Sequence, residues 1–411
     1  MRGVKYYIWL AESFPYGSVK PSKILETVDD LPQFYQDQKA YRKALPFLTL
    51  ADWDALQKTS LSACEAIIEQ CLKIGGRILC YDDSEYPERL KNIYAPPVVL
   101  YTKGHVDGLD SEVAITVVGT RYPSQYGIRA AGNLSYLLAR AGAVIVSGCA
   151  AGCDSYAHIG ALKAGGRTIG VLACGLDVNY PAASAAIKQK MLEKGGLITE
   201  LPPGTRPSKE IFPVRNRILS GLSLGVLVTE APVRSGALLT AEHGLQQGRD
   251  IFCVPTHDIF DARFNGAHRL LNDGAIPVHT AADVLNVYSE QYPHKLDFEK
   301  IKMDMQQMKV APSVHSIHAV KNLQAEVSPA IEHAKQSNPR LHTQVAQSLP
   351  AMDETTAAVY QMLSKNPKHI SELLPQAEEK GIPFPTLQAI LTELEISGCI
   401  VSLPGSRYAI I

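Results

Sequence analysis

The sequence has little that marks a secreted or metal-binding protein. Its eight cysteines are scattered, form no CxxC pair, and mostly lie in apolar runs or beside glycine. This usage is typical of small buried side chains in a reducing compartment and favours neither a disulfide framework nor a zinc site. Cys149 and Cys153 are four residues apart, but no further His or Cys pair completes a tetrahedral ligand set. We therefore expect no metal.

Long apolar segments and an excess of charge are also missing. The N-terminal stretch lacks the apolar region of a secretory leader, and no run is long enough to span a bilayer. We expect a soluble cytoplasmic protein that makes no membrane contact. The 40 Lys and Arg face 41 Asp and Glu, for a formal net charge of −1. Coating of nucleic acid by bulk electrostatics is thus disfavoured, which leaves room for a local basic site.

The composition and the spacing of apolar residues change along the chain. A length of 411 residues predicts more than one domain. Residues 1–85 carry apolar residues at helical spacing and predict a small helical domain. Residues 86–287 predict an α/β domain. Residues 288–352 are rich in Gln, Ser, Pro and His with little periodicity, and we expect a flexible linker. Residues 353–411 predict three helices followed by a hairpin, which is a winged-helix plan.

The α/β prediction rests on short apolar runs, from about residue 113, that end in glycine, proline or a polar turn residue. Such runs suit strands covered on both faces, and the stretches between them have helix spacing. Right-handed crossovers then give an extended Rossmann-like, doubly wound, mainly parallel sheet. No GxGxxG follows the first strand and no GxxxxGK[ST] occurs in the chain, so NAD binding and hydrolysis at a Walker loop are disfavoured.

Ligands of such sheets bind beyond the carboxyl ends of the strands. The first strand leads into Gly119-Thr120-Arg121 and the second into a loop with Ser147, Gly148 and Asp154. Glycine lets the backbone approach an oxyanion, helix-end NH groups hold it, and Arg121 would add a charge-assisted contact. Tight turns also need glycine, and Asp154 would equally serve as a helix cap, so both interpretations stay open.

A basic segment with an embedded aromatic is the second unusual feature. Residues 206–217 hold four cations against one acid, and Phe212 precedes Pro213, which stiffens the chain. A stiff aromatic among cations suits single-stranded nucleic acid, because the ring stacks a base while Lys and Arg hold phosphates. The alternative is that Phe212 packs in the core while the arginines pair with Glu200 and Glu230. The residues alone do not decide between the two.

A catalytic constellation is not indicated. Ser147, Asp154 and His158 are close in sequence, but a helix that begins near Cys153 places His158 more than a turn inside it. There the imidazole is expected to pack rather than to relay protons. We expect a protein that is not an enzyme, with no catalytic residues and no cofactor.

These segments together resemble the DNA-processing protein A family (DprA, also called Smf). The resemblance runs in unbroken order over about residues 86 to 278 and is carried by YPERLKNIYAPPVVLYTKG, ITVVGTR, VSGCAAGCDSYAHIGAL, GLDVNYP, FPVRNRILSGLS, VTEAPVRSGALLTA, GRDIFCVP and LLNDGAIPV. It implies a bacterial cytoplasmic protein that binds and protects incoming single-stranded DNA. It also implies a homodimer that loads the recombinase RecA on that strand during natural transformation.

The resemblance also assigns residues. The family's phosphate contacts match Arg121, Ser147 and Gly148, and the lysine and phenylalanine ahead of its RNR segment match Lys209 and Phe212. The RNR arginines match Arg215 and Arg217. They are expected to bind DNA, although a role in shaping the pocket against acidic neighbours is equally compatible. Dimer contacts are expected at Leu270 and Leu271. The residue after VP is Thr256 rather than glycine, so the following loop is expected to differ from relatives.

Two further expectations concern alternatives. Distant relatives of the fold cleave nucleoside monophosphates, which makes a nucleotide or phosphoribosyl hydrolase the rival function, but the PGGxGT run typical of those enzymes is absent. A purely structural scaffold would tolerate replacement of Arg121, Lys209 and Phe212.

Residues 353–411 hold four Lys and Arg against seven Asp and Glu. We therefore expect the winged-helix domain to contact protein or to regulate the central domain.

Overall fold

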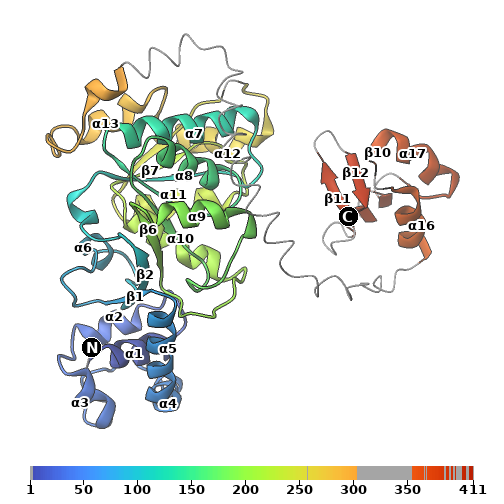
Figure 1. Cartoon of the computed structure of the whole chain (residues 1–411). Helices are drawn as coiled ribbons and strands as arrows, with labels where there is room; N and C mark the ends of the chain where they lie inside the picture. The colour runs from blue at the N-terminus through green and yellow to red at the C-terminus, as the bar shows by residue number, and fades with distance from the viewer. Residues whose placement is uncertain are drawn as a thin grey trace. The chain divides into compact units, whose positions relative to one another are not determined.

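The computed structural model describes residues 3–256, 258–302 and, beyond these, 354–364, 366, 368–383, 386–387, 390–391, 394, 400–403 and 407–410. The chain divides into two compact units, residues 1–327 and 328–411, which are drawn in Figure 1 and are treated separately below.

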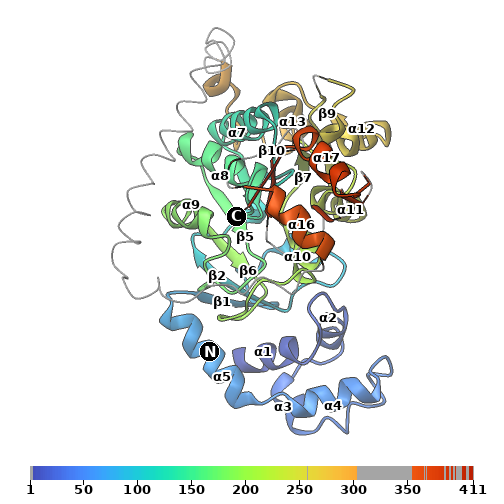
Figure 2. The same ribbon diagram turned by 90° about the vertical axis from the view of Figure 1, so that its right-hand side faces the viewer.

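The first unit opens with five helices: α1 (Val4–Glu12), α2 (Lys20–Leu25), α3 (Leu31–Gln36), α4 (Leu50–Lys58) and α5 (Leu61–Lys73). Local sequence sets their starts, since Asp30 caps α3 and a Thr49–Asp52 capping box begins α4. Trp9 and Phe34 lie buried at their centre in an edge-to-face contact, with ring centroids 5.5 Å apart. The five helices lie together at the end of the sheet that carries β1 and β2 (Figures 1 and 2).

A nine-stranded sheet forms the centre of this unit within the described residues, in the order β1-β2-β6-β5-β4-β3-β7-β8-β9. The strands are β1 (Arg77–Cys80), β2 (Val99–Gly104), β3 (Ala114–Val118), β4 (Val144–Ser147), β5 (Thr168–Val171), β6 (Gly196–Thr199), β7 (Gly225–Val228), β8 (Asp250–Cys253) and β9 (Ile276–Pro277). Strands β6 to β9 in this order pair in parallel, while β2 pairs antiparallel with both β1 and β6. The predicted fold class is confirmed.

Helices cover both faces of the sheet. The remaining elements of the unit are α6 (Glu88–Lys91), η1 (Leu109–Ser111), α7 (Gln125–Arg140), α8 (Cys153–Lys163), η2 (Ala182–Ser184), α9 (Ala185–Met191), α10 (Ile211–Gly221), α11 (Gly236–Gln246), η3 (Ala262–Phe264), α12 (Asn265–Asn272) and α13 (Ala281–Tyr288). One apolar core packs under α6, α10, α11 and α12, and the other under α7, α8 and α13. Strand β3 is buried throughout, which explains its continuous apolar sequence.

Two predicted boundaries differ from the structure. Strand β1 lies within the range assigned to the helical domain, so the sheet begins before residue 86. The segment 288–302, assigned to the linker, packs on the central domain: Leu296 and Phe298 join the α7–α8–α13 core, and the Asp297 N–H donates to the Ala141 carbonyl at 2.8 Å. Apolar residues in a weakly periodic segment suffice for such packing. The rest of the predicted linker, from residue 303, lies outside the described residues.

The second unit contains α16 (Glu354–Met362), β10 (Lys368–His369), α17 (Ile370–Glu379), β11 (Ile400–Leu403) and β12 (Arg407–Ile410). Its strands form an antiparallel sheet in the order β10-β12-β11. Four side chains of the expected third helix are buried in its core: Leu387, Ile390, Leu391 and Leu394. This agrees with the predicted helices and hairpin.

Neither unit shows a helix suited to a bilayer: among the described residues, none is both long and apolar enough to cross one. In the same residues no group of three or more His, Cys, Asp or Glu side chains is placed to hold a metal ion.

The acidic balance of the second unit leads to a first prediction. A domain that binds duplex DNA needs Lys and Arg side chains to contact the phosphates. Residues 353–411 instead carry a net charge of −3, from four Lys and Arg and seven Asp and Glu. We expect the isolated unit, which is compact on its own, to leave a labelled DNA duplex unshifted at physiological salt. Fluorescence anisotropy measures this, and binding that weakens steeply with salt would contradict the prediction.

Candidate nucleic-acid interface

The loops that carry the predicted residues meet at the carboxyl edge of the sheet. Strand β3 lies between β4 and β7, and the helices that follow β3 and β7 cover opposite faces. A crevice forms at such a point of divergence, and ligands of open α/β sheets bind there. A cavity of about 200 Å³ lies at this edge. It is lined by Arg121, Tyr122, Gly148, Ala150, Ala151, Leu172, Ala173, Tyr180, Pro181 and Phe212.

The loop between β4 and α8 forms the floor of this cavity, which we call the edge pocket. The Asp154 carboxylate accepts hydrogen bonds from the backbone N–H groups of Gly148 at 3.1 Å and Ala150 at 3.3 Å. Ser147 is fully buried, and its hydroxyl donates to the Val117 carbonyl at 2.6 Å. Ser147 therefore fixes the loop to β3, and Gly148 rather than the serine side chain borders the pocket. Asp154 organises this loop, while the N-cap of α8 is Gly152.

A buried guanidinium lies directly behind the floor. Arg215 is only 5% exposed, and a Cβ on Gly148 would overlap its Nη1 atom, so a side chain there would displace the guanidinium. The Nε and Nη1 atoms of Arg215 have no hydrogen-bond partner among the described residues. Burial lowers the pKa of Arg215, and nearby Asp154 opposes that shift. Burial likewise raises the pKa of Asp154 against the pull of Arg215. Each charge therefore favours the charged form of the other behind the pocket.

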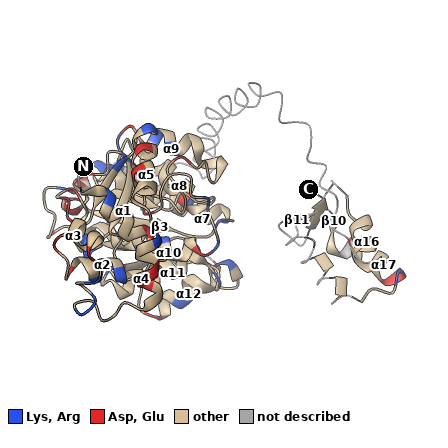
Figure 3. Ribbon diagram, turned by 90° about the horizontal axis from the view of Figure 1, so that it is seen from below, with Lys and Arg blue, Asp and Glu red and all other residues tan. Residues whose placement is uncertain are grey.

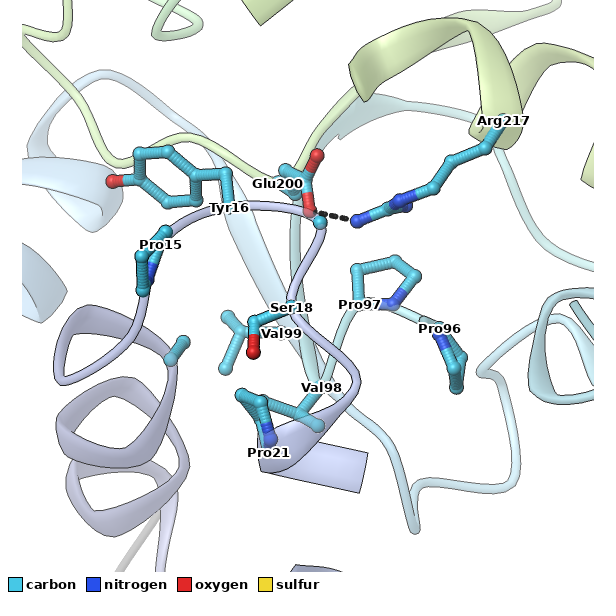
Figure 4. Close-up of a pocket in the computed structure, with 12 residues that line it drawn as sticks. Pro15, Tyr16, Ser18, Pro21, Pro96, Pro97, Val98, Val99, Glu200 and Arg217 are labelled. Atoms are coloured by element: carbon cyan, nitrogen blue, oxygen red, sulfur yellow. Dashed lines mark hydrogen bonds and ion pairs between the residues drawn. The ribbon is translucent and has the colours of Figure 1, made fainter. Parts of the chain in front are cut away.

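Arg217 has a different environment from the one expected for a DNA contact. It is buried, and its Nη2 atom lies 2.5 Å from Oε2 of the equally buried Glu200. Figure 4 shows this ion pair beside Tyr16 and Pro97, where the N-terminal helices meet the sheet. The Arg217 side chain does not line the edge pocket. The buried pair supports the junction between the helical domain and the sheet, as in the alternative in which the arginines meet acidic neighbours. A DNA contact of Arg217 stays a prediction.

The exposed part of the predicted cluster gathers around Phe212. The Arg121 guanidinium carbon lies over the Phe212 ring, 4.8 Å from its centroid. The Tyr180 ring packs against the same residue, with centroids 6.0 Å apart. Phe212 is half-buried at the pocket rim rather than in the core, and Lys209 is exposed just before α10. The position of Phe212 at the pocket fits the nucleic-acid interpretation of this segment. The pairing of Arg217 with Glu200 fits the alternative, in which the arginines meet buried acids. The other acid of the core alternative, Glu230, binds Ser124.

The basic character of this edge is local. Figure 3 shows Lys and Arg interspersed with Asp and Glu along the ribbon of the first unit. This matches the nearly neutral composition. Among the cations of the predicted cluster, Arg121 and Lys209 are exposed.

Ser147, Asp154 and His158, which are close in sequence, do not form a proton relay in the structure. His158 is buried in α8, and burial lowers its pKa to about 3. Its Nδ1 lies 2.7 Å from the Thr168 hydroxyl and its Nε2 lies 3.5 Å from the Cys149 sulfur. The imidazole is neutral and faces the interior, as expected from its place inside the helix.

The remaining predicted residues lie elsewhere. Leu270 and Leu271 are on α12, where both are partly buried against the core under α10, α11 and α12. The Thr256 hydroxyl bonds the backbone of Asp258, which shapes the start of the following loop.

Sequence reasoning missed two aromatic residues of the edge pocket. Tyr122 and Tyr180 are exposed at its rim, 87% and 37% respectively. In the sequence, Tyr122 is notable only because it follows Arg121. Tyr180 is notable only because it lies in the loop after β5.

Family models and known proteins agree on one family. The model described as DNA recombination-mediator protein A matches residues 77–289, and one described as the DprA winged helix domain matches 343–406. DNA processing protein DprA of Bacillus subtilis is 42% identical over 50% of this chain and 69% of its own length. Protein Smf of Synechocystis is 34% identical over 86% of this chain and 84% of its own. The X-ray structure of DNA processing protein A from Streptococcus pneumoniae matches with a TM-score of 0.58 and 31% identity, over 69% of this chain and 97% of that one.

The Arg217–Glu200 pair gives a second prediction. Arg217→Ala leaves Glu200 buried and uncompensated, so we expect a loss of about 3–5 kcal/mol of unfolding free energy in chemical denaturation. The matched control is the double variant Arg217→Met, Glu200→Leu, which removes both charges. We expect it to keep wild-type stability and affinity for single-stranded DNA. A stable double variant with weakened DNA affinity would support the predicted DNA contact of Arg217.

Proposed function

Because the chain belongs to the DNA recombination-mediator protein A family, we propose that it binds single-stranded DNA at the edge pocket. A role in DNA processing follows from the family itself. The finer proposal is that the chain protects an incoming strand in the bacterial cytoplasm and loads a RecA-type recombinase on it during natural transformation. The observation that carries it is the cluster of Arg121 over Phe212 at the rim of a glycine-floored pocket.

The phosphate part of the site depends on exposed cations. Arg121 and Lys209 are exposed at the rim and just before α10, and charge-assisted bonds from such groups to phosphate are about twice as strong as neutral ones. Arg215 lies buried behind Gly148, with the opposite charge of Asp154 near it. The N-terminus of α8 adds a favourable dipole at the same loop. Arg121 and Lys209 therefore carry most of the salt-dependent affinity.

The base part of the site depends on Phe212. Its half-buried ring is held by Tyr180 and by the proline that follows it in sequence. A fixed aromatic accepts any base because every base has a π-face, so the binding is independent of sequence. Bases in a duplex are already stacked and paired, which makes the single strand the preferred ligand.

We propose that the chain acts by binding rather than by catalysis. The rival function is hydrolysis of a nucleotide or phosphoribosyl compound. The edge pocket, at about 200 Å³, is smaller than the roughly 300–1,000 Å³ usual for pockets that enclose a whole small ligand. It suits one nucleotide of a strand that continues outside. His158 follows the pocket-floor loop in the sequence, but its imidazole faces the interior and not the edge pocket.

Homodimerisation belongs to the same proposal. Leu270 and Leu271 are the proposed contacts, and the neighbouring loop exposes Ile259 and Phe260, which are 71% and 89% accessible. Sedimentation of the intact chain measures this oligomeric state directly.

The first experiment is fluorescence anisotropy with labelled single-stranded oligonucleotides of several lengths, and with duplex of the same sequence, over a salt series. We expect the single strand to bind more tightly and its affinity to fall with salt. A RecA strand-exchange assay on coated single strands then tests loading. No binding to single strands at low salt would overturn the proposal, and a screen for nucleotide hydrolysis would decide for the rival.

Three variants give the third prediction. We expect Arg121→Ala and Lys209→Ala each to weaken binding by about tenfold or more and to reduce the salt slope by about 0.7, the value for one phosphate contact on a single strand. Phe212→Ala should weaken binding without changing the slope, because stacking releases no counterions. Lys73→Ala, an exposed cation on α5, is the matched control. Wild-type affinity in all three folded variants would remove the site and favour a purely structural role.

A further inference from the structure

We propose that Tyr122 is a second base-stacking platform, which holds a nucleotide next to the one on Phe212. This inference rests on the proposed function and extends its site by one nucleotide. Tyr122 lines the edge pocket together with Phe212 and Arg121, and its side chain is 87% exposed. Nothing in the proposed phosphate contacts uses it.

Tyr122 is exposed on an ordered loop. At one end, the Thr120 N–H donates to the Glu230 carbonyl at 2.8 Å, and the Tyr122 N–H donates to the Thr120 hydroxyl at 3.2 Å. At the other end, the Ser124 hydroxyl and N–H both donate to the buried Glu230 carboxylate. Pro123 fixes its own φ and restricts the residue before it to extended conformations. The backbone that presents the Tyr122 ring is therefore set before a ligand arrives.

The surroundings of Phe212 explain why a second ring is useful. Arg121 lies over the Phe212 ring and Tyr180 packs against it, so only part of its surface is open to a base. Tyr122 has no aromatic partner within the described residues and offers nearly all of its ring. An isolated exposed tyrosine is ordinary on a protein surface. One that borders a cationic pocket on a fixed loop has the geometry of the stacking platforms that follow a single strand.

The chemistry of the platform fixes its ligand class. A ring that stacks bases adds affinity without reading sequence and without contacting phosphate. Its contribution is thus independent of salt and requires unpaired bases. Pyrimidine and purine strands should both benefit, and a duplex should not.

A tryptophan at this position gives a direct readout. The chain has two tryptophans, Trp9 and Trp53, and both are buried among the N-terminal helices. In Tyr122→Trp the new indole is exposed, and we expect oligo-dT to quench its emission because a stacked thymine covers the ring. The matched control is Tyr94→Trp, at a tyrosine that is 78% exposed and lies outside the edge pocket. Its emission should not change.

Affinity supplies the second readout. We expect Tyr122→Ala to weaken binding of oligo-dT by about tenfold with an unchanged salt slope, while Tyr122→Phe binds as the wild type because stacking needs the ring and not the hydroxyl. Tyr94→Ala is the matched control and should bind as the wild type. Circular dichroism checks the fold of each variant.

The outcomes separate this inference from the proposed function. If Tyr122→Ala binds within twofold of the wild type and Tyr122→Trp is not quenched, while Phe212→Ala binds weakly, then the platform is wrong and the edge pocket stands. If the wild type itself binds no single strand, both fail together. A weakened Tyr122→Ala with a quenched Tyr122→Trp establishes the second platform.

Discussion

The loop that presents Arg121 and Tyr122 depends on one buried carboxylate, that of Glu230, which follows β7 closely in the chain. It accepts hydrogen bonds from the Ser124 hydroxyl and N–H at the start of α7, and its backbone carbonyl accepts from Thr120. A carboxylate at a helix N-terminus is stabilised by the unpaired N–H groups and the helix dipole. Gly127 is required because a Cβ there would overlap the carboxylate. Through these contacts the segment after β7 is hydrogen-bonded to the loop that presents Arg121 and Tyr122.

The two arginines of the RNR segment have different surroundings because they point to different sides of the same helix, α10. Residues two apart on a helix point to different sides, so Arg215 reaches the floor of the edge pocket while Arg217 reaches Glu200. Phe212 lies one turn before them, at the start of the same helix. Helix α10 therefore links the pocket to the N-terminal helices, since Val214 also packs against the turn at Gly17. The apparent basic cluster in the sequence therefore has an exposed end, which carries the proposed site, and a buried structural end.

The sequence predicts most of this arrangement where local chemistry decides it. Continuous apolar runs predicted the parallel strands. The glycine after β4 was predicted to let the backbone approach an oxyanion or to form a tight turn, and in the structure Gly148 lies against the Arg215 guanidinium. Burial is decided by tertiary contacts, which explains the differences. The hydroxyl of Ser147 turns inward to Val117 across the sheet, and β1 joins the sheet through antiparallel pairing with a strand some twenty residues later. The exposure of Tyr122 depends on the loop conformation that Glu230 imposes, and no spacing rule indicates it.

The contact between Arg121 and Phe212 makes phosphate binding and base stacking interdependent. In the free protein the guanidinium lies over the ring, and a cation–π contact of this exposed kind contributes about 0.5–1 kcal/mol. A charge-assisted hydrogen bond to phosphate is worth more, about 1.5–3 kcal/mol. A phosphate at the rim therefore draws Arg121 from the ring at small cost, and the uncovered face of Phe212 becomes available to the adjoining base. A free base without its phosphate lacks this advantage and must displace the guanidinium itself. On the proposed function, the pocket thereby favours a nucleotide within a strand over a free nucleobase, although neither half of the proposed site reads the identity of the base.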